Sequence, residues 1–286
     1  MNRPRRVVTS LGLGAALGCA GCFGTPSPLA PGVQGSVGVP QSGVLTNGVE
    51  LEARGPGFRR YRPRSPHYWG NPRLVTALRE AAAQVDAAHP GGSPLYVGDI
   101  APRRGGVIPG HRSHRTGRDV DLLFYLTTPS GAPIPSPGFV RLDSDGLGKV
   151  EGEEEDQYVR LDVERNWALV KTLMLSPHIG VQWLFASRGV EALLIDYARA
   201  RGEDLELVWH AETVLLQPGD SSPHDDHFHL RIACSPEELV AGCEGGGPYW
   251  PWLPLPEVPP WLPDAELRAL GRDDPLPLWE DATQAS

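Results

Sequence analysis

Nine histidines occur among the 286 residues, and five of them lie in two short polar segments. The first segment, residues 110–122, carries His111, His114, Asp119 and Asp121. The second segment spans residues 223–230 and carries the other three, namely His224, His227 and His229. Imidazole and carboxylate groups are the ligands that zinc takes outside cysteine sites. The two segments together therefore predict a zinc site.

The second segment has the alternation of a β-strand. Side chains of a strand point to its two faces in turn, so His227 and His229 share one face while Phe228 and Leu230 share the other. Two neighbouring imidazoles are unfavourable in an ordinary apolar core, because both need polar partners when they are buried. The pair is consistent with one metal ligand that lies beside one catalytic group.

The first segment supplies the other candidate metal ligands. Asp121 lies in a predicted strand, and His114 lies in the loop before it, where Gly117 allows the chain to turn back. Asp119 and Asp121 fall on one strand face, so spacing alone leaves open which of them binds metal. Three protein ligands leave a fourth position for water, which is typical of a catalytic zinc site. Zinc lowers the pKa of water from ~15.7 toward ~7, and His227 is the candidate to relay the proton.

No other nucleophile motif competes with this interpretation. The chain contains neither a Gly-x-Ser-x-Gly sequence nor a His-Glu-x-x-His sequence. Of the four cysteines, Cys234 and Cys243 lie beyond the N-terminal segment, and in an oxidising compartment we expect them to form a disulfide.

The N-terminus has the features of an export signal. In residues 1–22 a basic start precedes an apolar stretch that is too short for a permanent membrane span. Small residues precede Cys19 and Cys22, which predicts a lipoprotein signal with one of these cysteines acylated, and plain secretion is the alternative. Residues 23–48 are rich in Gly, Pro and Ser, and we expect them to form a flexible tether. The predicted location is the periplasm, with membrane contact only through the lipid anchor.

The charge balance argues against nucleic acid as a partner. The formal net charge is −9, and it becomes −12 when the three arginines of residues 1–22 are removed. Binding to a phosphate backbone requires clustered Lys and Arg, which this acidic body lacks. The sequence does not indicate an oligomeric state.

Several elements must position the two polar segments. We expect helices at 74–89, 163–175 and 190–201, strands at 95–100, 119–125, 181–185 and 227–233, and one or two strands within 205–216. The acidic run at 141–156 is expected to be a solvated loop, with a second cation site as the alternative. Helices and strands mix without regular alternation, which favours an α+β class with a mainly antiparallel central sheet flanked by helices. Residues 49–247 would form the catalytic domain, and residues 248–286 a Pro- and Trp-rich tail.

At these residues the sequence resembles the LAS metallopeptidases, and within them the penicillin-insensitive murein endopeptidases. The resemblance runs from about Gly70 to Gly247. It rests on five blocks: Gly98-Asp99-Ile100, Arg104-Gly105-Gly106, His111-Arg112-Ser113-His114, Gly117-Arg118-Asp119-Val120-Asp121 and His224-Asp225-Asp226-His227-Phe228-His229-Leu230-Arg231.

The resemblance implies a LAS-type fold and a zinc enzyme that cuts D-alanyl–diaminopimelate cross-links in peptidoglycan. It implies that His114, Asp121 and His229 are metal ligands, which selects Asp121 over Asp119. It also implies that His227 is the catalytic histidine, that His111 is an added ligand, and that His224 supports catalysis. Two alternatives remain: a zinc D,D- or L,D-carboxypeptidase, and a non-catalytic zinc module that binds cell wall.

Overall fold

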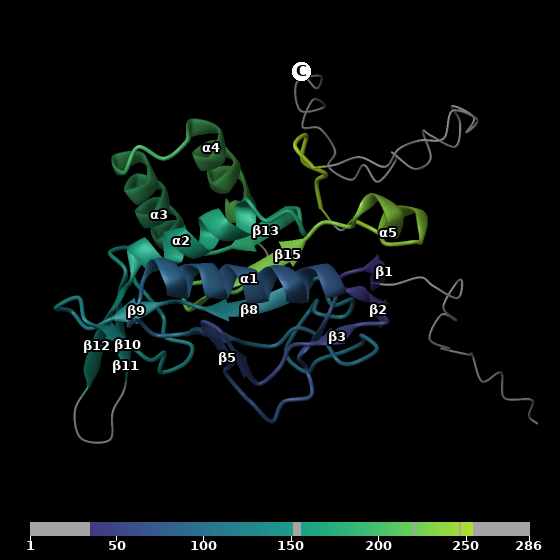
Figure 1. The fold of residues 1–286 in the computed structure, drawn as a ribbon, viewed down its shortest axis with the longest axis horizontal. Coiled ribbons are helices and arrows are strands. Elements are labelled where there is room, and N and C mark those ends of the chain that lie inside the picture. Colours follow the sequence, from purple (N-terminus) through teal and green to yellow (C-terminus); the bar gives the residue numbers. More distant parts are fainter. Residues whose placement is uncertain (1–34, 151–155, 220, 246, 254–286) are drawn as a thin grey trace, which may run out of the picture.

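The computed structural model describes residues 35–150, 156–219, 221–245 and 247–253 (Figure 1). Its centre is a seven-stranded sheet. In spatial order the strands are β14 (Leu215–Leu216), β13 (Val181–Phe185), β15 (His227–Ile232), β8 (Asp119–Leu123), β7 (Leu95–Val97), β5 (Phe58–Arg60) and β4 (Arg54–Gly55). The predicted signal at residues 1–22 lies outside the described residues.

Helices pack on this sheet, which confirms the α+β class. They are α1 (Pro72–Ala88), α2 (Val163–Met174), α3 (Arg188–Ala200), α4 (Leu205–Val214) and the short α5 (Pro236–Val240). Helix α1 packs on α2, and α2 packs on α3 and α4. Phe228 and Leu230 of β15 are fully buried in the core with residues of these helices. By strand alternation, the odd-numbered positions of β15 face away from the helices.

The central sheet is mixed, and the expectation of a mainly antiparallel sheet is corrected on this point. Strand β5 runs parallel to β7, and β13 runs parallel to β14. In each case helices connect the two strands: α1 lies between β5 and β7, and α3 and α4 lie between β13 and β14. A helical crossover returns the chain to the end of the sheet where it started, so the next strand runs in the same direction.

The predicted helices of residues 74–89, 163–175 and 190–201 are confirmed as α1, α2 and α3. Helix α1 begins where the Asn71 side chain accepts a hydrogen bond from the backbone N–H of Arg73. Its buried side includes Leu74, Leu78 and Val85.

The expectation of one or two strands within residues 205–216 is met only at the last two residues, and the rest of the segment is helical. Residues Leu205–Val214 form α4, and only Leu215–Leu216 form a strand. The Asp204 carboxylate caps this helix by accepting from the N–H of Leu207, and Leu207, Ala211 and Val214 are buried at helical spacing. The cap and the helical period outweigh the strand preference of the Val and Trp residues in this segment.

The expectation of a flexible tether is also wrong for residues 35–48. Strands β1 (Gly35–Val39) and β2 (Ser42–Thr46) form an antiparallel hairpin. Ser36 and Leu45 are buried, and the Ser36 hydroxyl donates to the carbonyl of Thr116 at 2.7 Å. Alternating valines around a tight turn form this hairpin despite the high Gly content. Residues 23–34 lie outside the described part of the chain.

Two smaller groups of strands complete the described fold. A four-stranded sheet contains β10 (Pro133–Ile134), β9 (Leu126–Thr127), β12 (Gln157–Leu161) and β11 (Leu147–Val150), and β3 (Val49–Glu50) pairs with β6 (Trp69–Gly70). Part of the acidic run is therefore strand β11, while residues 151–155 are outside the described residues. Of the predicted tail, residues 248–253 are described, and Trp250 donates its indole N–H to the carbonyl of Gln182 at 2.7 Å.

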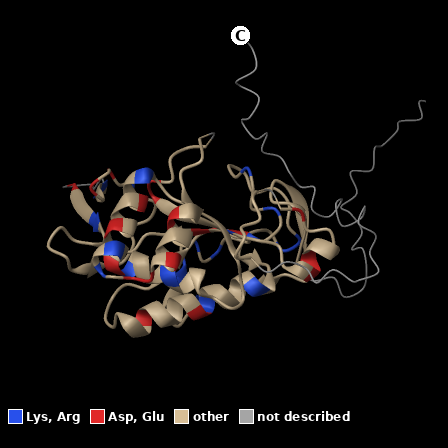
Figure 2. Ribbon diagram, turned by 90° about the horizontal axis from the view of Figure 1, so that it is seen from above, with Lys and Arg blue, Asp and Glu red and all other residues tan. Residues whose placement is uncertain are grey.

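Charge is spread over the surface. Figure 2 shows acidic and basic residues interspersed along the helices rather than gathered by sign. None of the described helices is both long and apolar enough to cross a membrane.

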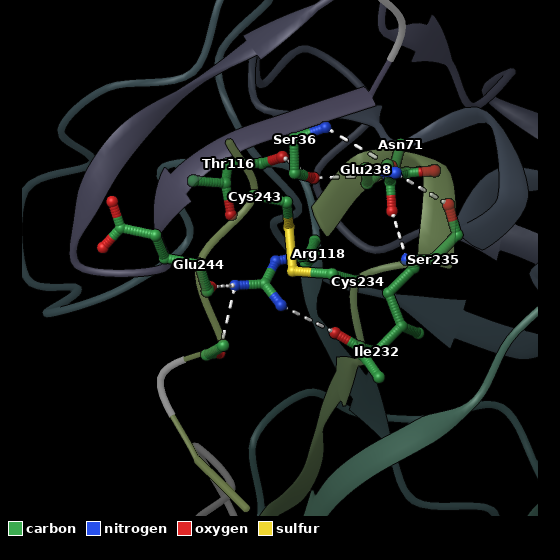
Figure 3. Close-up of a disulfide and its surroundings, with 12 residues drawn as sticks. Ser36, Asn71, Thr116, Arg118, Ile232, Cys234, Ser235, Glu238, Cys243 and Glu244 are labelled. Atoms are coloured by element: carbon green, nitrogen blue, oxygen red, sulfur yellow. Dashed lines mark hydrogen bonds between the residues drawn. A yellow bond between two sulfur atoms is a disulfide. The ribbon is translucent and has the colours of Figure 1, made fainter. Parts of the chain in front are cut away.

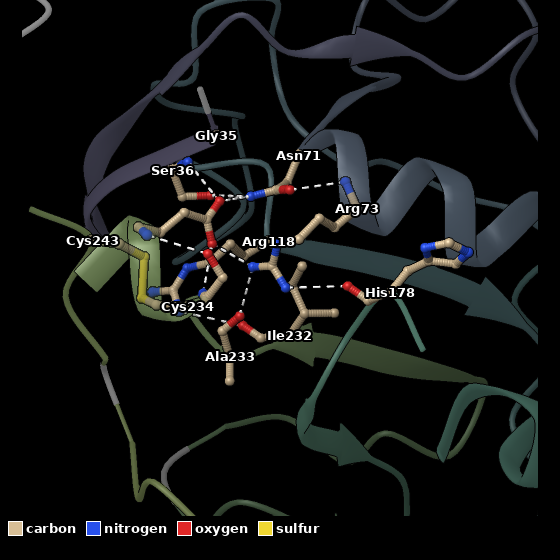
Figure 4. Close-up of polar contacts among 12 residues, drawn as sticks. Gly35, Ser36, Asn71, Arg73, Arg118, His178, Ile232, Ala233, Cys234 and Cys243 are labelled. Atoms are coloured by element: carbon tan, nitrogen blue, oxygen red, sulfur yellow. Dashed lines mark hydrogen bonds and ion pairs between the residues drawn. A yellow bond between two sulfur atoms is a disulfide. The ribbon is translucent and has the colours of Figure 1, made fainter. Parts of the chain in front are cut away.

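The predicted disulfide between Cys234 and Cys243 is present (Figure 3). Beside it lies a group of polar side chains that we call the disulfide-side cluster, made of the buried Ser36, Asn71, Arg118 and Glu238 and the partly buried Arg73 (Figure 3, Figure 4). The Glu238 carboxylate accepts from the side chains of Asn71 and Arg73 and from the N–H of Ser235. Arg118 donates to the carbonyls of Ile232 and Glu244. The cluster ties the N-terminal hairpin to α1 and to the chain that follows β15.

Candidate metal centre

The two histidine segments predicted from the sequence meet on neighbouring strands. Strand β15 pairs antiparallel with β8, and the register places His229 opposite Asp121 and His227 opposite Leu123. His114 comes from the loop before β8 and has a φ of +64°, in the left-handed region that few non-glycine residues adopt. Its N–H donates to Asp119 Oδ2 at 3.3 Å. The loop is thus held in a conformation that brings His114 to the strands.

Three of the predicted ligands converge closely. His114 Nε2 lies 3.2 Å from Asp121 Oδ1, and His229 Nδ1 lies 3.3 Å from the same oxygen. The two imidazole nitrogens are 3.3 Å apart. Ligands at about 2.0–2.1 Å from a tetrahedral zinc ion stand about 3.3–3.4 Å from one another, because they occupy the edges of a tetrahedron. The spacing of the three atoms therefore fits a zinc ion.

The other nitrogen of each imidazole is already engaged. His114 Nδ1 donates to the carbonyl of Ile100 at 2.9 Å. His229 Nε2 donates to Asp119 Oδ1 at 2.9 Å. In the neutral form of each ring, these bonds place the proton on the engaged nitrogen and leave His114 Nε2 and His229 Nδ1, which lie beside Asp121, available to bind a metal. Carbonyl and carboxylate partners of this kind orient metal-binding imidazoles and fix their tautomer.

Asp119 and Asp121 have different environments, although the sequence could not separate them. Asp119 accepts from His229 and from Arg231 Nε at 2.7 Å. Burial would raise the pKa of Asp119, but the charges of Arg231 and His229 hold it far below its usual range. This carboxylate is satisfied by donors and orients His229. Asp121 is the carboxylate that faces the free imidazole nitrogens.

One oxygen of Asp121 lacks a hydrogen bond. Its Oδ1 atom is buried and accepts no hydrogen bond from the described residues, although three imidazole nitrogens surround it. Burial opposes the charge on Asp121, yet the neighbouring His114 holds its pKa well below the usual range. A buried, ionised oxygen amid imidazoles requires a cation or added protons. The residues present therefore fit a bound divalent metal.

His227 lies at the edge of this group. Its Nε2 atom is 3.4 Å from Asp121 Oδ1, and its Nδ1 atom is 2.5 Å from Asp226 Oδ1. Burial favours the neutral ring, but the Asp121 and Asp226 carboxylates raise the pKa of His227 to about 10. Phe139 packs edge-on against the imidazole, with 5.1 Å between ring centroids.

His111 and His224 flank the trio on different sides. His111 lies 3.8 Å from Asp121 Oδ2 and 3.6 Å from Asp99 Oδ2. His224 has a buried Nδ1 atom with no hydrogen-bond partner among the described residues. Burial and the neighbouring His229 and His227 lower the pKa of His224 to about 4, so the ring is neutral. The six predicted site residues therefore form one cluster, within which His111, His114 and Asp121, and also His224, His227 and His229, are each close enough to share an ion.

The cluster forms one wall of an open cavity of about 900 Å³. Tyr61, Phe139 and Phe185 supply aromatic surface to it, and Arg62 and Arg231 supply cations. The cavity has room for a peptide beside the imidazoles.

Four further residues were given no role by the sequence reasoning. Asp99 contacts His111, Asp226 contacts His227, Phe139 packs on His227, and Arg231 contacts Asp119. A signal existed for Asp226, which adjoins His227, and for Arg231, which continues the alternation of His227 and His229. Nothing local marks Phe139, which comes from a distant loop.

The fold and this cluster define a candidate metal protein of α+β class with a histidine–aspartate site in an open cavity. The resemblance found in the sequence is confirmed by a family comparison: residues 36–135 match the family described as penicillin-insensitive murein endopeptidase. That match includes His111, His114 and Asp121, while His224, His227 and His229 lie beyond it.

Individual relatives carry the same name. The chain is 32% identical over 92 residues to the penicillin-insensitive murein endopeptidase of Klebsiella pneumoniae subsp. pneumoniae, covering 32% of this chain and 33% of that protein. It is 30% identical over 97 residues to the protein of the same name from Escherichia coli O139:H28, covering 34% of this chain and 35% of the relative. The alignments thus span about a third of the length of these curated relatives.

Proposed function

We propose that this protein is a zinc-dependent murein endopeptidase that hydrolyses D-alanyl–diaminopimelate cross-links of peptidoglycan. The observation that carries the proposal is the convergence of His114 Nε2, His229 Nδ1 and Asp121 Oδ1 at zinc-ligand spacing, inside the cavity. The similarity to murein endopeptidases over residues 36–135 supports the substrate class.

In this proposal His114, Asp121 and His229 hold the metal, and Ile100 and Asp119 orient the two imidazoles. When bound, zinc supplies Lewis acidity, which polarises a carbonyl and lowers the pKa of water. His227 holds or moves a proton at its Nε2 atom, while Asp226 fixes its ring through Nδ1. His111 is an added ligand that contacts Asp99. His224 is a neutral imidazole that supports the active site from the same wall of the cavity.

The location follows from the substrate. A murein endopeptidase acts in the periplasm, and the predicted lipoprotein signal would tether this domain to a membrane through an acylated Cys19 or Cys22. We propose no contact with nucleic acid.

Digestion of isolated, cross-linked sacculi by the purified protein tests the proposal. Chromatography of the released muropeptides should show dimers falling and monomers rising, and a chelator should stop both changes. Release of terminal D-Ala alone would identify a carboxypeptidase instead. Zinc binding with unchanged muropeptides would identify a non-catalytic cell-wall module and refute the enzyme.

A further inference from the structure

Arg231 is a buried cation on the wall of the cavity. It follows His229 by two positions on β15, so the two side chains share one strand face. Its side chain is 6% exposed. Its Nε atom donates to Asp119 Oδ1 at 2.7 Å, and its guanidinium carbon lies 5.9 Å from the centre of the Phe185 ring. The guanidinium is therefore held in one orientation from two sides.

Only part of this guanidinium is used by the residues that the structure describes. Among them, Nε is the one atom of the Arg231 side chain with a hydrogen-bond partner, and the two terminal amino groups have none. Neither amino group is a fully buried atom without a partner, so both keep some access to solvent. Arg231 lines the cavity, and a ligand in the cavity is therefore placed to reach them.

Arg118 shows what a purely structural arginine does in the same fold. It is fully buried, and its terminal amino groups donate to the carbonyls of Ile232, Glu244 and Gly245. Arg231 lies on β15, which pairs with the strand that follows Arg118, and it bonds through its inner nitrogen, while its terminal amino groups have no partner among the described residues. The fork of a guanidinium matches the two oxygens of a carboxylate.

We infer that Arg231 is an anion subsite of the cavity, which binds a diaminopimelate carboxylate of the stem peptide. This inference rests on the proposed function, and it adds the group of the substrate that the site recognises. A cross-link contains one such carboxylate beside the amide nitrogen, on the acceptor diaminopimelate, and another beside the free amino group of the donor diaminopimelate. Arg231 lies on one side of His229 along β15 and His227 on the other. A carboxylate held at Arg231 would therefore place the neighbouring peptide across the metal ligands.

The other arginines of the cavity fit this role less well. Arg62 and Arg112 line the cavity but are exposed. An exposed pair with a carboxylate gains little, because water screens it and the long side chain loses freedom. Arg231 is already desolvated and oriented by Asp119, so a bond to it costs less ordering and is less screened.

Selectively amidated substrates test the subsite. Three cross-linked dimers are compared: one unmodified, one with the acceptor diaminopimelate carboxylate converted to an amide, and one with the donor carboxylate converted. One of the two amidations should lower kcat/KM of the wild type by roughly 10- to 100-fold, the scale of a lost charge-assisted hydrogen bond. The same amidation should change kcat/KM of Arg231→Lys by less than about threefold, because lysine keeps the charge beside Asp119 but loses the fork. The sensitive dimer identifies which carboxylate binds.

A matched control is Arg59→Lys. Arg59 is an exposed arginine of β5 that lies over Tyr96 and outside the cavity, so this variant should discriminate among the dimers as the wild type does. Zinc content, measured for every variant, shows whether the metal site is intact. If Arg231 only held Asp119 in place, amidation would lower kcat/KM of the wild type and of Arg231→Lys by the same factor. That result would overturn the inference. It is equally overturned if neither amidation slows the wild type.

A binding measurement separates this inference from the proposed function. Calorimetric titration uses a tripeptide ending in diaminopimelate, with its carboxylates free or amidated. The free peptide should bind the wild type roughly 10-fold or more tightly than it binds Arg231→Lys, and the amidated peptide should bind both alike. If the wild type cleaves none of the dimers, the proposed function fails while this titration still decides the subsite. Equal affinity of the free peptide for both proteins would rule the subsite out.

Discussion

Two buried carboxylates, one on β8 beside β15 and one on α5 after it, have opposite surroundings. Glu238, in the disulfide-side cluster, has donors on both oxygens, including the side chain of Asn71 (Figure 3) and that of Arg73. Asp121, in the metal centre, has an oxygen that three imidazole nitrogens surround but that accepts no hydrogen bond from the described residues. The first arrangement is complete without any added group. The second needs a cation or added protons, because charge without a partner is costly in the interior.

The buried polar atoms that lack a hydrogen-bond partner differ in character between the two regions. In the disulfide-side cluster the buried atoms without a partner include the Nε groups of Arg73 and Arg118, which are donors on cations. In the metal centre they are Asp121 Oδ1 and His224 Nδ1, an anionic oxygen and a nitrogen of a neutral imidazole. A metal ion could relieve the second pair and would be repelled by the first. Buried polar character alone therefore does not mark a functional site, whereas an anionic oxygen among imidazoles does indicate one here.

The largest effect should come from removing an imidazole of the trio. His229→Ala should reduce bound zinc to background and lower the cleavage of sacculi by more than roughly 10³-fold, since loss of a single stabilising donor can already cost that much. Metal analysis after gel filtration measures the first effect, and muropeptide chromatography the second. His210→Ala is a matched control, because His210 stacks on Trp252 outside the cavity. Full zinc content in His229→Ala would remove this residue from the ligand set.

The next effect separates a ligand from a catalytic group. His227→Ala should keep most of its zinc but lose roughly 10²- to 10⁴-fold in kcat, the usual contribution of general acid–base catalysis. Its Nδ1 atom is engaged by Asp226, and the other nitrogen contacts Asp121 at the edge of the trio. Turnover at the wild-type rate would show that His227 has no catalytic part. Loss of zinc equal to that of His229→Ala would make it a ligand.

A smaller effect should come from the carboxylate behind His229. Asp119→Asn keeps the size of the side chain but removes the charge that holds His229 and Arg231. Zinc affinity should fall by about 10- to 100-fold, as is typical when a partner of a metal-binding histidine is changed. Competition with a chromophoric chelator measures the affinity. Asp86→Asn on the exposed side of α1 should leave it unchanged. An unchanged affinity in Asp119→Asn would mean that His229 does not need this orientation.

Sequence periodicity was sufficient for much of this site. The alternation of His227 and His229 with apolar neighbours predicted their shared face, and β15 confirms it, with Phe228 and Leu230 buried on the other side. What periodicity could not provide was the pairing of β15 with β8. That register sets His229 opposite Asp121 over a separation of more than a hundred residues, and it depends on how the whole sheet packs. The difference between Asp119 and Asp121 follows from that register.

The errors in the fold have a similar origin. Residues 35–46 are rich in small residues that suit a tether, yet they pair into a hairpin because Ser36 and Leu45 have partners in the distant residues Thr116 and Arg104. Residues 205–214 contain strand-favouring side chains, but the N-cap at Asp204 stabilises a helix there. Local preference is weak where tertiary contacts or a cap oppose it.

The smallest effect on zinc binding and cleavage should come from a change in the disulfide-side cluster. Glu238→Gln keeps the shape of the disulfide-side cluster but replaces a carboxylate that accepts from Asn71 and Arg73 with an amide that satisfies them only in part. The free energy of unfolding should fall by about 1–3 kcal/mol, while zinc affinity and cleavage stay within about twofold of the wild type. Urea unfolding measures the first quantity and chelator competition the second. Glu237→Gln, at the exposed neighbouring position, should change neither. A drop in zinc affinity for Glu238→Gln, at conditions where the variant is fully folded, would show that the two regions are coupled through β15 and that the contrast between them is incomplete.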